Sequence, residues 1–129
     1  MKRKITHVAL VVNDYDEAID FYVNKLKFTL VENTKLDENK RWVLVSPNVD
    51  KSSSILLAKA EGEEQQNFVG NQVGGRVFLF LNTDNFEEDY QNLLKNDVKI
   101  VREPKDEPYG KVLVFEDLYG NLWDLIEPN

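Results

Sequence analysis

The sequence predicts an α+β fold in which two βαβββ modules stand in tandem and form a concave, open-barrel groove. An internal repeat is the main reason, because residues 6–14 resemble residues 76–84 at an offset of 70. The same offset pairs two further apolar segments, 28–31 with 98–101 and 42–45 with 112–115. Near the end it slips to 68 and pairs 54–58 with 122–126. One offset kept across separate segments indicates two copies of a unit that cannot bury its own sheet face alone.

The first module is expected to hold a strand, a helix and three further strands. Residues 5–12 are rich in β-branched side chains, which favour a strand. Asp14 is expected to cap the helix, with Glu17 three residues later as in a capping box. Apolar side chains then recur at helical spacing across residues 15–26, namely Ala18, Ile19, Tyr22, Val23 and Leu26. The remaining elements are strands at 28–33, 41–46 and 54–59, a turn at 37–39 and a loop at 47–54.

The second module repeats this order. Its first strand is expected at 76–82, and Asp84 or Asn85 is expected to cap a helix with an inward stripe of Phe86, Tyr90, Leu93 and Leu94. Strands follow at 98–102, 111–116 and 121–126, and residues 117–121 form a hairpin turn in which Gly120 takes a positive φ. Residues 61–75 are polar and contain glycine, which predicts a linker with a short helix near 65–69. We therefore expect one domain over 1–129, with modules at 1–60 and 76–129.

Composition excludes several classes of protein. The chain has no cysteine, which excludes a disulfide framework, a thiolate nucleophile and a zinc–thiolate site, and fits a reducing compartment. Its net charge of −7 disfavours nucleic acid and anionic membranes as partners. The basic N-terminus lacks the features of a signal peptide, and no apolar stretch approaches the length of a membrane span. We expect a cytoplasmic protein whose partner is a small molecule.

Two segments resemble a known superfamily. Residues 14–22, Asp-Tyr-Asp-Glu-Ala-Ile-Asp-Phe-Tyr, resemble the first helix of the vicinal oxygen chelate superfamily, which includes glyoxalase I, the extradiol dioxygenases and the bleomycin-resistance proteins. Residues 115–125, Phe-Glu-Asp-Leu-Tyr-Gly-Asn-Leu-Trp-Asp-Leu, resemble its last hairpin, where D-P-D-G-N is usual, although Leu118 and Tyr119 replace Pro and Asp. The resemblance covers nearly the whole chain. It implies paired βαβββ modules around a groove and, because members pair modules across two chains, a homodimer.

The resemblance also implies where a metal would bind. In metal-dependent members, His, Gln and Glu ligands come from the first and last strands of each module. The matching positions here are His7, Leu56, Val77 and Asp124, which we expect to converge on one groove. Leu56 and Val77 cannot bind a metal, and a single histidine excludes the two-His-one-carboxylate triad of the extradiol dioxygenases. We therefore expect no cofactor and no catalytic metal.

Several residues keep more than one interpretation. His7 is a titrating base, a hydrogen-bond partner for a ligand, or a polar remnant bonded to Asp124 or water. Asp124 is an anchor for a cationic group, or a partner for His7 or Arg76. Trp42, which follows Arg41 at a strand start, offers a flat face to a ligand or packs in the core. Trp123 is expected in the core, because it flanks Asp124 on the opposite strand face.

A charged segment with two prolines, residues 102–110, is either a binding lip that presents Tyr109 or a rigid surface hairpin. The candidate ligand-binding residues are therefore His7, Arg41, Trp42, Leu56, Val77, Tyr109 and Asp124. No catalytic residue can be named, and one histidine without cysteine disfavours a nucleophilic triad.

We favour a protein that sequesters a small organic molecule in its groove without a metal, as the resemblance to bleomycin-resistance proteins implies. One alternative is a glyoxalase-I-like, metal-dependent lyase or isomerase with a reduced metal site, which His7 and Asp124 support and Leu56 and Val77 oppose. The other is a non-catalytic module that binds a partner protein. Whether the chain is an enzyme stays open at this point.

Overall fold

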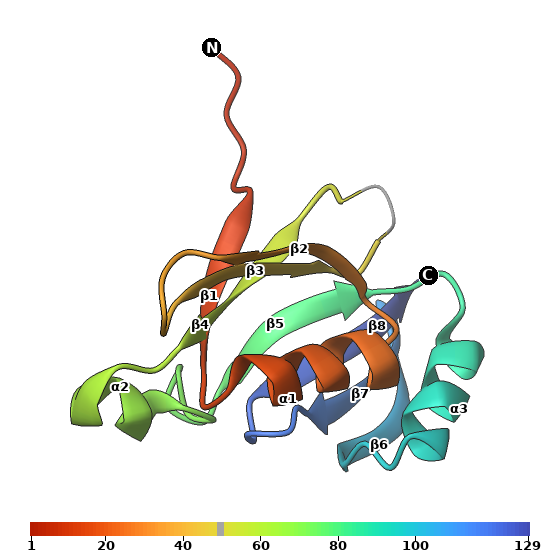
Figure 1. The fold of residues 1–129 in the computed structure, drawn as a ribbon. Coiled ribbons are helices and arrows are strands. Elements are labelled where there is room, and N and C mark those ends of the chain that lie inside the picture. Colours follow the sequence, from red (N-terminus) through yellow and green to blue (C-terminus); the bar gives the residue numbers. More distant parts are fainter. Residues whose placement is uncertain (49–50) are drawn as a thin grey trace. The chain divides into compact units, whose positions relative to one another are not determined.

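Each half of the chain folds as a βαβββ unit, which confirms the predicted fold class. The computed structural model describes residues 1–48 and 51–129, so residues 49 and 50 of the expected loop at 47–54 lie outside the described residues. The described chain divides into two compact units, Met1–Val69 and Gly70–Asn129 (Figure 1).

The first unit holds a four-stranded mixed sheet in the order β1-β4-β3-β2. Its strands are β1 (His7–Val12), β2 (Thr29–Lys35), β3 (Arg41–Ser46) and β4 (Ser54–Lys59). Strand β1 runs parallel to β4, and the other neighbours are antiparallel. Helix α1 (Tyr15–Ile19) packs against β3 and β4. Because side chains alternate along a strand, Leu10 and Val12 are buried beneath the helix, whereas His7 and Ala9 lie on the opposite face. We call the face of each sheet away from its helix the open face.

The first helix begins as predicted but ends differently. The Asp14 side chain accepts a hydrogen bond from the backbone N–H of Glu17 at 2.9 Å, which confirms the N-cap. After α1 the helix continues as a π-helix, η1 (Asp20–Lys25), rather than as the expected α-helix to residue 26. At its end the Leu26 N–H donates to the carbonyl oxygen of Phe21, five residues earlier. A π-helical turn accommodates one residue more than an α-helical turn does.

The second unit repeats the arrangement with the sheet order β5-β8-β7-β6. Its strands are β5 (Val77–Asn82), β6 (Ile100–Glu107), β7 (Gly110–Glu116) and β8 (Leu122–Pro128). Asn85 caps helix α3 (Phe86–Lys95) by accepting a hydrogen bond from the Glu88 N–H at 3.2 Å. Phe86 and Leu93 of the expected stripe are buried. Leu94 is 44% exposed, so its predicted inward position is wrong, because successive helical residues point about 100° apart.

The charged segment with two prolines is mostly strand. Strand β6 runs through it and pairs with β7 as far as Glu107 opposite Gly110, so the segment is a surface hairpin rather than a loop. The register shifts between Arg102 and Lys105, on either side of Pro104. Proline has no backbone N–H to donate to a ladder and is tolerated at such irregularities on edge strands.

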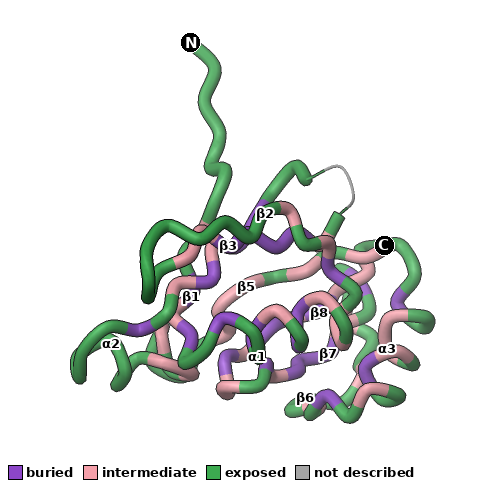
Figure 2. Tube along the Cα trace, in the orientation of Figure 1, coloured by how far each residue is buried: buried purple, intermediate pink, exposed green. Residues whose placement is uncertain are grey.

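The linker contains the short helix α2 (Gly62–Phe68), which begins earlier than predicted. None of its residues is buried, as the exposed colouring of this segment in Figure 2 shows. Within residues 1–48 and 51–129, no helix is long and apolar enough to cross a membrane.

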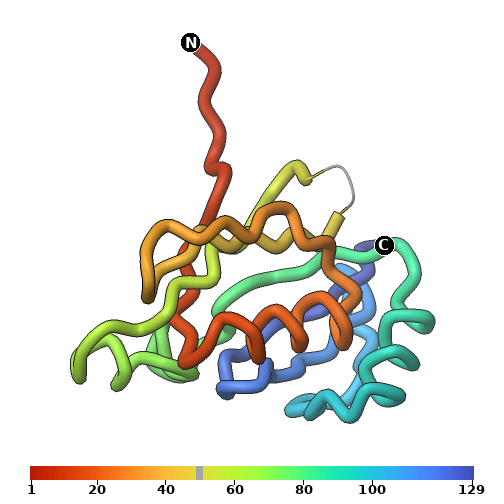
Figure 3. Tube along the Cα trace, viewed as in Figure 1, coloured from red at the N-terminus to blue at the C-terminus, as the bar shows by residue number. Residues whose placement is uncertain are grey.

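Figure 3 shows the chain turning between β7 and β8 within the blue, C-terminal part of the trace. This turn is built on one buried carboxylate, that of Asp117. Oδ1 of Asp117 accepts hydrogen bonds from the backbone N–H groups of Tyr119, Gly120 and Asn121 at 2.9 to 3.0 Å. Its Oδ2 accepts another from Nδ2 of Asn121 at 2.9 Å. Gly120 has a φ of 105°, as predicted. In the core nearby, Trp123 stacks on Phe115 with ring centroids 6.0 Å apart, which confirms its predicted position.

The two units differ by two irregularities of one residue each. Ala9 pairs with Leu56 in the first sheet, so a constant offset of 70 would place Leu79 opposite Asp124. Instead a register shift between Val77 and Leu79 places Phe80 there. Strand β5 thus holds one extra residue, a β-bulge, and the offset becomes 71. For this reason Asn85, not Asp84, corresponds to the cap Asp14.

The offset returns to 70 after the helices. Lys27 and Asp97, which follow the two helices, both have positive φ, at 65° and 57°, and lie 70 residues apart. The extra residue that η1 accommodates in the first unit therefore cancels the extra residue of β5 in the second. The offset of 70 residues predicted from the sequence is therefore correct for most strands. Between the bulge in β5 and the end of α3 it is wrong by one residue.

Candidate functional site

Three of the predicted site residues share the open face of the first sheet. Leu56 pairs with Ala9 of β1 and with Leu44 of β3, so the alternation of side chains places His7, Trp42 and Leu56 on the same face. The rings of His7 and Trp42 meet edge to face, with centroids 6.2 Å apart and an interplanar angle of 77°. Trp42 is only half-buried, so its indole is not enclosed in the core.

A pocket of about 240 Å³ borders this tryptophan. It lies where the start of β3, the end of β4 and the beginning of α2 meet, and its lining includes Tyr15, Arg41, Trp42, Leu56 and Gln65. Half of the lining is aromatic or aliphatic, and the other half is polar, namely Lys40, Arg41, Lys59, Glu61 and Gln65. Its volume suits a fused-ring fragment or part of a larger molecule better than a whole drug-sized ligand.

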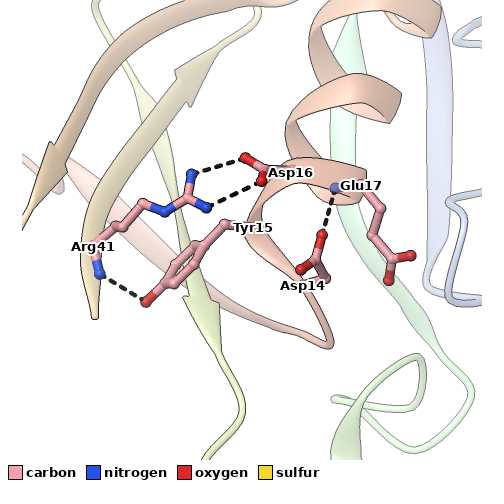
Figure 4. A network of polar contacts seen from close by, with 5 residues as sticks. All are labelled: Asp14, Tyr15, Asp16, Glu17 and Arg41. Carbon is pink, nitrogen blue, oxygen red and sulfur yellow. Dashed lines mark hydrogen bonds and ion pairs between the residues drawn. The ribbon is translucent and has the colours of Figure 1, made fainter. Parts of the chain in front are cut away.

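Arg41 lies on the helix-covered face, opposite Trp42, and is already held by α1 (Figure 4). Its Nη1 and Nη2 donate to the two carboxylate oxygens of Asp16 at 2.8 and 3.1 Å, and its guanidinium lies 5.0 Å from the centroid of the Tyr15 ring. The backbone N–H of Arg41 donates to the Tyr15 hydroxyl at 3.1 Å.

This network fixes the start of β3 against α1. The Arg41 hydrogen bonds and positive charge lower the pKa of Asp16 below its ordinary value, so the pair stays ionised at neutral pH. Asp16 is exposed, so the pair contributes little to stability. Its structural effect is to hold Tyr15 and Arg41 as one wall of the pocket, with Trp42 next along the strand.

The open face of the second sheet carries Val77 and Asp124. Among the residues that the structure describes, Oδ1 of Asp124 is the one buried side-chain oxygen or nitrogen that lacks a hydrogen-bond partner. This oxygen therefore does not bond to Arg76, one of the partners considered for it. Burial raises the pKa of the Asp124 carboxyl above its ordinary value, and the positive charge of Arg102 lowers it by less.

The direction of that shift has a consequence for stability. A carboxyl whose pKa is raised by folding stabilises the fold fully below its unfolded pKa, and this contribution is lost as pH rises through the folded pKa. At neutral pH the ionised Asp124 is therefore unfavourable for folding. Residues that weaken the fold in this way are typical of binding and catalytic sites.

Phe80 is a candidate site residue that the sequence did not indicate. It pairs with Asp124 across β5 and β8, shares the open face, and is 69% exposed. The run from Val77 to Leu81 is apolar without interruption, so alternation cannot reveal which residues face solvent. A bulge in such a run has no sequence signal of its own.

Tyr109 is separate from these residues. It is exposed in the turn between β6 and β7, and the next residue, Gly110, pairs with Pro128. Pro128 lies four residues along β8 from Asp124, roughly 13 Å at the rise of a strand. The structure therefore does not bring Tyr109 to the carboxylate.

The donor set does not fit a catalytic divalent ion. On the first open face His7 accompanies Leu56, and on the second Asp124 accompanies Val77, so each unit supplies one donor at the positions implied by the resemblance. Within the described parts of the chain, no three His, Asp or Glu side chains lie together in a group that could hold a metal. Octahedral ions prefer more protein oxygen and nitrogen ligands than this. That His7, Leu56, Val77 and Asp124 converge on one groove stays a prediction.

Comparison with known proteins gives one family and several close folds. The family model of the Glyoxalase/Bleomycin resistance protein/Dioxygenase superfamily matches residues 4–125. An uncharacterized protein of Shewanella frigidimarina (strain NCIMB 400) is 61% identical over all of this chain and 96% of its own length. The crystal structure of UcmS2 is 27% identical with a TM-score of 0.86, covering 98% of this chain and 99% of that one. TnmS3, an antibiotic binding protein from Streptomyces sp. CB03234, is 26% identical with a TM-score of 0.78, covering 99% and 98%.

Proposed function

Because the chain belongs to the glyoxalase/bleomycin resistance protein/dioxygenase superfamily, we propose that it binds and sequesters a small organic molecule without a catalytic metal. Trp42 carries this proposal. Its half-buried indole lies on an open sheet face, contacts His7, and borders the pocket of about 240 Å³. A rigid aromatic side chain in this position gives a flat ligand a large stacking surface at a small entropic cost. The likeness to an antibiotic binding protein supports the same function.

Metal independence is the second part of the proposal. Leu56 and Val77 occupy positions where metal-dependent relatives are expected to carry ligands. Polarising vicinal oxygens needs a Lewis acid, and a single histidine and a single aspartate on separate units are a poor set to retain one. The alternative function, a glyoxalase-I-like lyase or isomerase, requires that further side chains supply the missing donors.

A thermal-shift screen tests both parts together. We expect flat aromatic compounds to raise the melting temperature by mass action, whereas nickel and zinc at equal concentration do not. The purified protein should show no metal-dependent turnover of a glutathione hemithioacetal. A nickel- or zinc-dependent activity that His7→Ala abolishes would establish the lyase instead. Absence of stabilisation by every compound of a broad aromatic set would contradict the binding function.

We also propose a homodimer in the cytoplasm. Each sheet, taken by itself, ends in edge strands, β1 and β2 in the first and β5 and β6 in the second. Unpaired edges favour pairing with another chain, and closed two-fold dimers are the commonest oligomers. Light scattering at micromolar concentration should give twice the mass of the 15.0 kDa chain. A single species of monomer mass would show the dimer to be wrong.

A further inference from the structure

The β5 bulge changes which side chain lies beside Asp124. In the first sheet the equivalent position is Ala9, whose small side chain lies beside the half-buried Leu56. In the second sheet the extra residue brings Phe80 into this position and turns its ring to the open face. Bulges re-aim side chains in this way and are common beside functional sites.

Phe80 and Asp124 have two properties that are unusual for residues with a purely structural role. Phe80 exposes most of its ring on a strand whose other large side chains are at least half-buried. Asp124 keeps a buried oxygen without a hydrogen-bond donor among the described residues, although a buried acceptor is normally satisfied. An exposed aromatic ring and an unsatisfied carboxylate oxygen therefore belong to paired residues of adjacent strands.

We infer that Phe80 and Asp124 form a binding site for the protonated amino group of a small-molecule ligand. An ammonium group is attracted to the face of an aromatic ring and donates charge-assisted hydrogen bonds to a carboxylate. The net charge of −7 favours the approach of a cation. The inference rests on the proposed function, since it specifies the chemistry of one group on the bound molecule.

Arg102 is the competing cation for Asp124. It pairs with Val114 of β7, which in turn pairs with Asp124, so it lies two strands away on the same sheet. Its charge acts on Asp124, but Oδ1 receives no hydrogen bond from it. If Arg102 were the true partner, removing the charge of Asp124 would lower stability. If instead a ligand is the partner of Asp124, its charge is uncompensated in the ligand-free protein. Asp124→Asn should then raise the melting temperature of the free protein at neutral pH.

The decisive experiment compares an amine with its neutral isostere. Calorimetric titration with 2-phenylethylamine and with 2-phenylethanol should show at least about tenfold tighter binding of the amine to the wild-type protein. Asp124→Asn should remove this preference, and Phe80→Ala should weaken amine binding by several-fold. Asp106→Asn is the matched control, because it removes the same charge from an exposed position of the second unit and should change nothing.

Several results would overturn the inference. These are equal affinity for amine and alcohol, no amine binding at millimolar concentration, or an Asp124→Asn protein that binds the amine as Asp106→Asn does. A fall in the melting temperature of free Asp124→Asn would assign Asp124 to Arg102 and overturn it as well. The proposed function fails separately, when no neutral flat ligand binds in a Trp42-dependent manner. A neutral ligand that needs Trp42, without any preference for amines, would retain the function and remove this inference alone.

Discussion

Replacing Asp117 with alanine is expected to lower the free energy of unfolding by about 3–5 kcal/mol. Asp117 is 4% exposed and accepts hydrogen bonds from three backbone N–H groups and the side-chain amide of Asn121, which is also buried. Truncation removes the carboxylate acceptor that these donors share, although the Gly120 N–H still donates to the backbone carbonyl of Asp117 at 3.1 Å. Removing the acceptor of a buried donor costs more than an ordinary hydrogen bond contributes. Urea unfolding should show a lower midpoint with an unchanged m-value.

Two variants locate the cause of this loss. Asp117→Asn keeps one acceptor oxygen for the backbone but presents an NH₂ group to Nδ2 of Asn121, so it should destabilise by an intermediate amount. Asp106→Ala removes an exposed carboxylate from the same unit and should stay within about 0.5 kcal/mol of the wild type. If Asp117→Ala and Asp106→Ala unfold at the same midpoint, the carboxylate does not support the turn.

Replacing Trp42 with alanine is expected to weaken binding of a flat ligand by about 1–3 kcal/mol, roughly 5- to 150-fold in affinity. The indole is the largest side chain bordering the pocket, and it lies on a sheet face that its own helix does not cover. Isothermal titration with the best compound of the thermal-shift screen measures the change.

The Trp42→Ala variant must remain folded for its lower affinity to report on ligand binding. Truncating a fully buried tryptophan lowers the free energy of unfolding by about 3–5 kcal/mol. Because Trp42 is only half-buried, Trp42→Ala should lower it by less. Trp42→Phe keeps an aromatic face and should recover part of the affinity. A large fall in melting temperature with unchanged affinity per folded molecule would instead make Trp42 a core residue.

The fold could be predicted because its signals are local and repeated. Strand β3 follows from an apolar run that the repeat pairs with residues 112–115, and the Asp14 cap follows from capping chemistry. Both are observed where expected. The repeat then gave the order of elements, since each segment had a counterpart. Boundaries shifted where no signal exists, as in β6, which continues through Pro104 because an edge strand needs only one set of ladder bonds.

The candidate site was less accessible from the sequence. The resemblance grouped His7 with Leu56, and the register of β1 and β4 places both on one face. Trp42 kept two interpretations in the sequence, and the register of β3 with β4 places it on the same face. Phe80 was missed because β5 is apolar on both faces around it, and its neighbour in space, Asp124, lies 44 residues away in sequence. Arg41 was grouped with Trp42 because they are adjacent in sequence, but adjacent strand residues point to opposite faces.

The bulge in β5 and the π-turn in η1 have a consequence for the history of the two copies. Each is a one-residue difference in length, and because one falls in each copy, the halves remain alignable end to end without a gap. Such an alignment compares the wrong residues throughout the first helix and most of the strand before it. Ancestral reconstruction from this duplication therefore needs a pair of offsetting gaps. Without these gaps, Phe80 is aligned with the buried Leu10 rather than with Ala9. The alignment then does not compare the residues at which the two open faces differ.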